Sequence, residues 1–316
     1  MKVLFAGTPL NAAETLTALH NNGIEIAGVL TRIDAPVGRK RVVTPSPVAI
    51  VAEHLGIPVI KANRVDELVL EQIKSVDADL GIAVAYGAIF KAPTLEALPL
   101  GWINVHFSLL PDWRGAAPVQ HSILNGDKTT GITIFQLDEG MDTGPVHLQV
   151  PTEISPAETS GELLSRLTKL GVSGLLEVLP RIAAGLASTT AQTSNGQARI
   201  ATKLSRELAH IDWSDSAFAI EHKVCAMNPE PMAWTSLDGE SFRIISARAL
   251  GAIDWATLEG TELEPGTLLT KEKRALVTCG KGTLLELKEV QPSGKQIMNA
   301  ADWHRGMQTN KKVQFS

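Results

Sequence analysis

The first half of the chain alternates short apolar runs with segments whose apolar residues recur at helical spacing. The apolar runs, which we interpret as strands, cover residues 3–6, 24–30, 59–60, 80–85 and 103–106. Helices are predicted between them over residues 11–20, 47–55 and 65–74. Strands that lack polar alternation and are separated by helices are typical of a mostly parallel sheet covered on both faces. We therefore expect an α/β fold that begins with a Rossmann-like, mostly parallel sheet domain.

The same pattern continues toward the middle of the chain. It predicts a helix over residues 116–124 and strands over residues 132–137 and 146–150. Thr159 and Glu162 have the spacing of a capping box, which marks the start of a further helix. Leu163, Leu167 and Leu170 would form the apolar face of that helix.

A polar tract without periodicity, residues 187–200, interrupts this pattern and is the best candidate for a linker. Beyond it we find one clear helix, at 214–227, and strand patterns at 232–237, 241–247, 275–278 and 284–290. Short strands that flank glycine-containing turns indicate a small β-barrel of the oligonucleotide-binding (OB) type. We predict a catalytic domain over residues 1–186, a linker over 187–205 and a barrel domain over 206–316.

Composition narrows the class of protein. The chain has 316 residues, of which 44% are hydrophobic and 20% charged, as in soluble globular proteins with two domains. No apolar run approaches the roughly 20 residues that span a bilayer, and two cysteines suit a reducing cytoplasm. The net charge of -5 means that any RNA contact must come from local basic patches. The first predicted strand lacks the G-x-G-x-x-G fingerprint, and we find no zinc motif, so we expect neither a dinucleotide nor a metal.

Three residues could support acyl transfer to an amine. Asn104 and His106 lie two apart on a predicted strand, so their side chains point to the same face. Asn104 can donate to a developing oxyanion, His106 can transfer a proton, and Asp142 can hold the histidine or relay protons. Taken alone, His106 reads as a structural histidine and Asp142 as an ordinary turn aspartate. Arg114 could close a loop or contact the substrate.

The segments around these residues resemble a known family. Asn-Val-His-Phe-Ser-Leu-Leu-Pro at 104–111, with Asp-Glu-Gly-Met-Asp-Thr-Gly at 138–144, is similar to the folate-dependent formyltransferases. The elements at 113–118, 211–213 and 228–234 resemble the methionyl-tRNA formyltransferases within that family. The chain departs from the family at Leu10-Asn11, where an aromatic residue commonly follows Thr-Pro, and this departure concerns local packing more than chemistry.

The resemblance implies a reaction. The donor would be 10-formyltetrahydrofolate, and the acceptor the α-amino group of methionine on initiator tRNA. Asn104 and a protonated His106 would donate to the oxyanion, while Asp142 would keep His106 charged and help to carry the proton. The residues implied to contact the folate are Ser108, Leu109, Leu110, Pro111, Ile89, Phe90 and Asp138.

The resemblance also implies contacts with tRNA. The matching loop of the family enters the acceptor stem, which assigns this role to Arg39, Lys40 and Arg41, with Arg39 as the leading contact. Lys203 is implied as a further contact. Three adjacent basic residues are otherwise usually a solvated charge cluster. Scattered lysines of the barrel could touch phosphates or only keep it soluble. We expect a monomer that binds initiator methionyl-tRNA and folate and no membrane.

Three alternatives remain open on the sequence. A formyltransferase acting on an amino sugar nucleotide would share the catalytic trio, but the basic loop and residues 228–234 argue against it. Glycinamide ribonucleotide formyltransferase needs no barrel domain. A catalytically inactive RNA-binding protein would have little reason to keep Asn104, His106 and Asp142 at these spacings.

Overall fold

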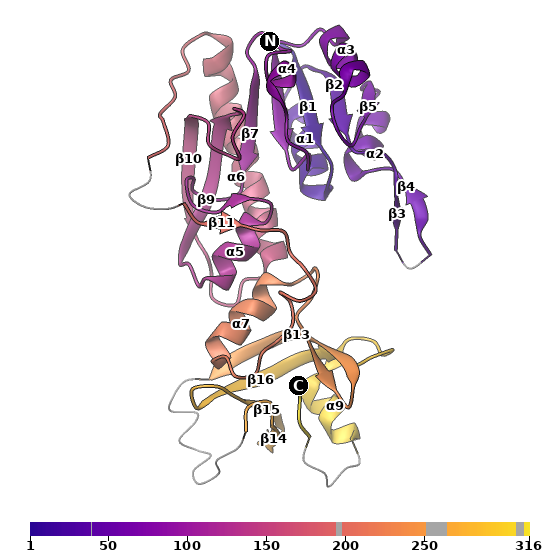
Figure 1. Ribbon diagram of the computed structural model, residues 1–316, viewed down its shortest axis with the longest axis vertical. Helices are drawn as coiled ribbons and strands as arrows, with labels where there is room; N and C mark the ends of the chain where they lie inside the picture. The colour runs from indigo at the N-terminus through magenta and orange to yellow at the C-terminus, as the bar shows by residue number, and fades with distance from the viewer. Residues whose placement is uncertain (39, 194–197, 251–263, 308–312) are drawn as a thin grey trace. The chain divides into compact units, whose positions relative to one another are not determined.

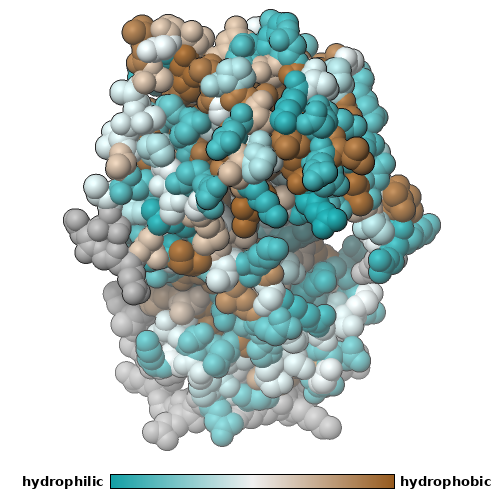
Figure 2. All heavy atoms as spheres, turned by 45° about the horizontal axis from the view of Figure 1, so that its top comes forward, coloured by the Kyte–Doolittle hydropathy of each residue, from teal (hydrophilic) through white to brown (hydrophobic). Residues whose placement is uncertain are grey.

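The structure is a computed structural model of the chain and describes all residues except 39, 194–197, 251–263 and 308–312. Internal contacts divide the chain into two units. The first unit comprises Met1–Pro118, Thr129–Glu153 and Leu164–Thr202, and the second comprises Val119–Lys128, Ile154–Leu163 and Lys203–Ser316. Hydrophilic and hydrophobic side chains are mixed over the surface seen in Figure 2. Among the helices that the structure describes, none combines the length and apolarity that crossing a membrane requires.

A seven-stranded sheet organises the first unit (Figure 1), in the order β10-β9-β7-β6-β1-β2-β5. Its strands are β1 Val3–Gly7, β2 Ile26–Thr31, β5 Val59–Lys61, β6 Leu80–Val84, β7 Trp102–His106, β9 Thr129–Gln136 and β10 Val146–Glu153. The five strands from β7 to β5 are parallel, whereas β9 pairs antiparallel with both β7 and β10. Every residue of β1 and β6 is buried, as their continuous apolar sequences require. The expected mostly parallel sheet is confirmed.

Helices cover this sheet. They are α1 Leu10–Asn21, α2 Pro47–His54, α3 Glu67–Ser75, α4 Ala92–Leu95 and most of α6 Ser160–Ala183. The sequence did not predict α4, which is a single turn that begins with Ala-Pro. Gly174 lets α6 approach the sheet closely, because a Cβ there would lie 3.0 Å from the Ile134 side chain. Thr159 and Glu162 form the expected reciprocal capping bonds at the start of α6.

The strand order reverses at β1. The chain passes from β1 to β2 and β5 on one side, and then returns to place β6 and β7 on the other. Ligands of open α/β sheets bind beside such a reversal, outside the carboxyl ends of the strands. A side chain at Gly7 would collide with Ala12 and with the carbonyl of Val84, and the Thr8 hydroxyl donates to the carbonyl of Tyr86 at 3.0 Å. The loops that follow β1 and β6 are therefore held together at this edge.

The basic segment predicted as a loop is a β-hairpin. Strands β3 Ala35–Val37 and β4 Val42–Thr44 pair antiparallel and form a sheet of their own (Figure 1). The turn between them has Gly38 and Arg41 in the left-handed region, and the Arg41 amide donates to the Gly38 carbonyl at 3.1 Å. The pairing of β3 with β4, which was not predicted from the sequence, therefore gives a regular backbone to the part of this segment that the structure describes.

The second unit contains a five-strand path in the order β12-β13-β16-β15-β14, and β17 pairs with β16. The strands are β12 Trp234–Leu237, β13 Glu240–Leu250, β14 Leu268–Lys271, β15 Arg274–Cys279, β16 Thr283–Gln291 and β17 Met298–Asn299. The last residues of the chain connect the two edges. The Phe315 amide donates to the Gly266 carbonyl, and the Ser316 amide to the Ser236 carbonyl. These bonds join the edges of the sheet, as the predicted barrel requires.

In the described part of residues 203–316 the second unit has two helices, where the sequence indicated one. Helix α7 Ala217–Ala226 matches the prediction, and Ser216 caps it by accepting from the Ala219 amide. Helix α9 Ala300–Gly306 corrects the expectation of a single helix. It is too short to show a clear apolar period, although Asn299 caps it. Its Trp303 packs against Phe242, with ring centroids 4.7 Å apart.

We expect acid to weaken the fold. Burial lowers the pKa of His106, His147, His222 and His304. Between the folded-state pKa values and the unfolded value of about 6.5, the unfolded chain binds more protons, so the free energy of unfolding falls as the pH drops through this range. Urea unfolding at pH 7.5 and pH 5.5 measures the effect. His222→Gln should reduce the difference, and His54→Gln, at an exposed position, serves as the control. Equal stability of the wild type at both pH values would contradict the prediction.

Candidate active site

His106 ends β7 and is only 5% exposed. Its Nε2 atom lies 2.9 Å from the carbonyl oxygen of Trp113. Because a carbonyl can only accept, Nε2 carries a proton and donates it. The other ring nitrogen, Nδ1, lies 3.8 Å from Oδ2 of Asp142. The structure thus brings together His106 and Asp142, as expected from the sequence. It also gives His106 a second partner, the Trp113 carbonyl, which was not expected.

Asp142 lies in a loop whose conformation requires a glycine at position 144. A Cβ at Gly144 would lie 1.8 Å from the Gln136 carbonyl oxygen, so no other residue fits there without a shift. Asp138 ties the loop together by accepting from the Thr143 hydroxyl at 2.8 Å. Asp142 itself has a φ of 55°, in the left-handed region that favours glycine, and its Oδ2 accepts from the Gly115 amide at 2.8 Å. The carboxylate is thereby held facing the imidazole.

Opposing influences act on the imidazole. Burial lowers the pKa of His106, while the Asp142 carboxylate and the Trp113 carbonyl act to raise it. Since Nε2 is already donating to a carbonyl, the titrating proton belongs to Nδ1, on the side of Asp142. The pair can therefore accept and release a proton at one defined atom.

Asn104 lies two residues before His106 on β7 and is half-buried. Its backbone takes part in the sheet, where it is paired with Ala83 and Phe135. Within the ranges that the structure describes, its side-chain amide makes no hydrogen bond. A donor at the carboxyl end of a central strand is thus available to an oxygen atom of a ligand.

The turn at 108–111 is fixed from β9 and β10. The Thr133 hydroxyl accepts from the Leu110 amide at 3.0 Å and donates to the Ser108 carbonyl at 2.7 Å. Gln149 donates to the Leu110 carbonyl at 2.6 Å. Thr133 and Gln149 were not predicted from the sequence, because neither belongs to the motif whose backbone it holds.

The chain is similar in sequence to known proteins over nearly its whole length. Residues 1–179 match the family described as formyl transferase, and residues 203–308 match the formyl transferase C-terminal domain. The chain belongs to the formyl transferase family. A relative from Renibacterium salmoninarum named methionyl-tRNA formyltransferase is 46% identical over 307 residues, or 97% of each chain. A relative of the same name from an Arthrobacter species is 44% identical over 317 residues, covering 100% of each.

A solved structure shares the fold of this formyl transferase. It is an N-formyltransferase from Helicobacter canadensis in complex with folinic acid and dTDP-3-aminofucose, with a TM-score of 0.67 and 19% identity. The match covers 92% of this chain and 99% of that one. At this identity the likeness concerns the fold alone.

The residues predicted to contact folate differ in accessibility. Ile89 is 77% exposed, and Asp138 is also exposed. Phe90, by contrast, is buried in the core, where its ring centroid lies 4.6 Å from that of Trp102 and 5.5 Å from that of Tyr86. Phe90 can therefore support the shape of a ligand site from beneath, while Ile89 presents its side chain outward. Their roles stay predictions.

The residues predicted to contact tRNA lie at the surface. Lys40 and Arg41 are exposed in the turn between β3 and β4, and Lys203 is exposed where the second unit resumes. Arg39 lies outside the described residues. Their roles also stay predictions.

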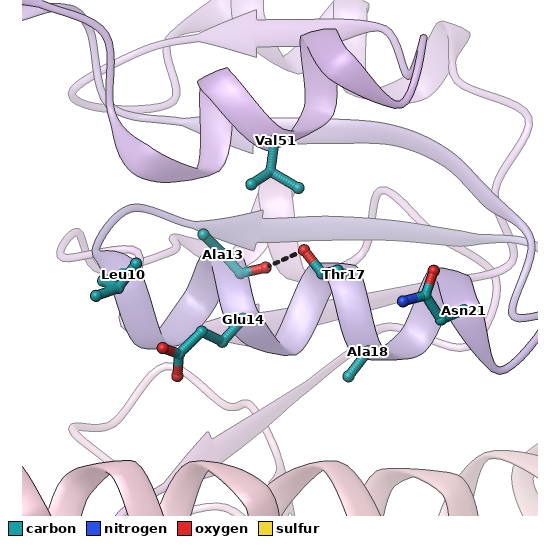
Figure 3. A pocket seen from close by; sticks show the side chains of 7 residues that line it. All are labelled: Leu10, Ala13, Glu14, Thr17, Ala18, Asn21 and Val51. Carbon is teal, nitrogen blue, oxygen red and sulfur yellow. Dashed lines mark hydrogen bonds between the residues drawn. The ribbon is translucent and has the colours of Figure 1, made fainter.

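A groove of about 340 Å³ lies between α1 and α2 (Figure 3). It is lined by Leu10, Ala13, Glu14, Thr17, Ala18, Asn21 and Val51. The Thr17 hydroxyl is occupied by the Ala13 carbonyl, to which it donates at 2.9 Å. The groove contains none of the residues predicted for catalysis or for folate, so the edge of the sheet at His106 stays the predicted site of the chemistry.

Proposed function

We propose that this formyl transferase moves the formyl group of 10-formyltetrahydrofolate onto the α-amino group of methionine carried by initiator methionyl-tRNA. The observation that carries the proposal is the approach of His106 and Asp142 beside Asn104, in a chain 46% identical to a named methionyl-tRNA formyltransferase. We place the activity in the cytoplasm and assign it to the monomer.

The chain's residues divide the work of acyl transfer. Asn104 donates to the formyl oxygen as the amine attacks and negative charge develops there. His106 takes the proton of the amine at Nδ1, and Asp142 stabilises the imidazolium that results. The new bond joins the amine nitrogen to the formyl carbon, and the bond from that carbon to the folate nitrogen breaks. His106 then returns the proton to the departing nitrogen.

This division of work modifies the interpretation made from the sequence. There, a protonated His106 shared the oxyanion with Asn104. Because Nε2 donates to the Trp113 carbonyl, only the Nδ1 side of the ring is free to serve the reacting groups. We therefore assign oxyanion donation to Asn104 and proton transfer to the pair of His106 and Asp142.

The folate is expected beside the turn at 108–111. Thr133 fixes the backbone of Ser108 and Leu110, whose side chains are buried, and so sets the shape of this turn. We propose that the pterin lies against Ser108, Leu109, Leu110 and Pro111, near Ile89 and above Phe90. Backbone groups of the loop that Asp138 organises would read its hydrogen-bonding edge.

The acceptor stem is expected at the β3–β4 hairpin. With a net charge of -5, the whole surface cannot attract a polyanion, so local cations must do so. Lys40 and Arg41 stand at the turn, and the neighbouring Val42 and Val43 are 59% and 65% exposed. A hairpin with a basic tip and apolar sides suits a nucleic acid end, where phosphates and base faces are both accessible.

Arg41→Ala should weaken productive binding of charged tRNA and leave folate affinity unchanged. Loss of one phosphate contact should make the slope of log affinity against log salt shallower by about 1. We expect Arg39→Ala to act in the same direction. Formylation kinetics and tRNA affinity at several salt concentrations test this, with Lys169→Ala, an exposed lysine on α6, as the matched control. Equal tRNA efficiency and slope in Arg41→Ala and wild type would return the hairpin to a solvated charge cluster.

The function itself is tested by offering three acceptors with 10-formyltetrahydrofolate. These are aminoacylated initiator tRNA, an amino sugar nucleotide and glycinamide ribonucleotide. We expect formyl-methionine on the tRNA and no formylation of the other two. Formylation of the amino sugar nucleotide without formylation of the tRNA would overturn the proposal.

A further inference from the structure

Gln192 connects two parts of the active site from a segment that the sequence predicts as linker. Its Nε2 atom donates to the main-chain carbonyls of Asp142 at 2.9 Å and Gly144 at 2.8 Å. Its Oε1 accepts from the Arg114 guanidinium at 2.6 Å. One side chain thus satisfies a donor and two acceptors on segments 48 to 78 residues away.

The bonds from Gln192 matter because Asp142 is in an unfavourable backbone conformation. A left-handed φ is unfavourable for a residue with a side chain and persists only when its surroundings hold it. The carbonyl of Asp142 is fixed by Gln192, while its Oδ2 is fixed by Gly115. Without the bond to its carbonyl, the peptide is free to turn, and the carboxylate leaves the position facing His106.

Arg199 holds Trp113, the other partner of His106, in a similar way. Its guanidinium lies 4.3 Å from the centre of the Trp113 ring and pairs with Asp112 at 2.7 Å. Trp113 also has a left-handed φ, of 62°, and its carbonyl accepts from His106. Stacking and the ion pair therefore hold a second strained residue whose main chain contacts the imidazole.

The backbone of the same segment adds a third attachment. Strand β11 Ile200–Ala201 pairs in parallel with β8 Arg114–Gly115. A Cβ at Gly115 would lie 2.5 Å from the Ala201 carbonyl oxygen, so glycine is needed for this approach. Gly115 is the residue whose amide binds Asp142.

We propose that Gln192 and Arg199 are positioning residues for formyl transfer, and that the segment following α6 holds both partners of His106 in place. The inference deepens the proposed function and rests on it. Gln192 acts through Asp142, and Arg199 acts through Trp113. The segment is thus part of the catalytic unit in addition to connecting it to the rest of the chain.

The test is a double-mutant cycle between Gln192→Ala and Asp142→Asn. A displacement of about 1 Å can cost about 10²-fold in rate, and we expect a loss of that order in kcat for Gln192→Ala, with an unchanged KM for folate. In the Asp142→Asn background the same substitution should cost little, because the group it positions is gone. Gln192→Glu should resemble Gln192→Ala, since a carboxylate cannot donate to two carbonyls but can still pair with Arg114. Thr193→Ala, at the exposed neighbouring position, is the matched control.

A titration of His106 by NMR gives a readout that needs no substrate. When the Asp142 carboxylate moves away, the pKa of His106 should fall in Gln192→Ala and stay unchanged in Thr193→Ala. Additive losses of kcat in the cycle, or an unchanged titration, would show that Gln192 serves only stability and overturn the inference. If the wild type formylated none of the acceptors, the proposed function would fail, and the titration would still decide whether Gln192 positions Asp142.

Discussion

Asn104→Ala should lower kcat by about 10²- to 10³-fold, the usual cost of losing a donor to an oxyanion. The amide lies at the carboxyl end of a central strand and has no hydrogen-bond partner among the described residues, so its removal leaves the fold intact. Asn104→Asp is the sharper variant, because it keeps the shape and replaces the donor with a group that repels the developing charge. Steady-state formylation with both substrates saturating measures the loss.

His106→Ala should lower kcat by a similar or larger factor, since acid–base groups contribute about 10²- to 10⁴-fold to the rate. The side chain is 5% exposed, and its removal could also disturb packing. His106→Gln addresses this, because an amide can still donate to the Trp113 carbonyl but cannot transfer a proton. Thermal unfolding of each variant separates the two effects. Near-wild-type turnover in Asn104→Asp or His106→Gln would show that the assigned roles are wrong.

The positions of the proposed catalytic residues in the fold could be predicted from the sequence, because they depend on local rules. Asn104 and His106 share a face through the two-residue period of a strand. The strand end at which they lie follows from alternating strands and helices, which specify a parallel sheet. Asp142 was recognised from its resemblance to a family motif, and the collisions that a side chain at Gly144 would cause explain one glycine of that motif.

The partners of these residues could not be predicted in the same way. Gly115 is 27 residues from Asp142, Gln192 is 50 residues from it, and Arg199 is 87 residues from Asp112. No periodicity connects such positions. Residues 187–200 were predicted as a linker only because they are polar and show neither helical nor strand periodicity. Gln192 belongs to that tract, and its partners are two carbonyls and one guanidinium from distant parts of the chain.

In the second unit, too, the features that depend on local sequence were predicted and those that depend on distant or very short segments were not. Its hairpins were predicted from turn residues, and β12 and β13 do pair across Asp238 and Gly239. The joining of the sheet edges depends on residues 313–316, which are too few to carry a strand period. Helix α9 was missed for the same reason, since seven residues complete only about two helical turns.

Asp142→Asn should fold normally and lose at least about 10²-fold in kcat. The substitution keeps the size of the side chain, and its amide oxygen can still accept from Gly115. It removes the charge that faces Nδ1 of His106, because the amide oxygen that accepts from Gly115 takes the place of Oδ2, and a neutral amide stabilises the imidazolium less than a carboxylate does. The pKa of His106, already lowered by burial, should therefore fall further, and His106 becomes a weaker acceptor for the proton of the amine. Steady-state kinetics and NMR titration of His106 measure the two effects, with Glu139→Gln, an exposed carboxylate of the same loop, as the control. Turnover near that of the wild type in Asp142→Asn would mean that the amine loses its proton by another route, and the pair of His106 and Asp142 would then be structural.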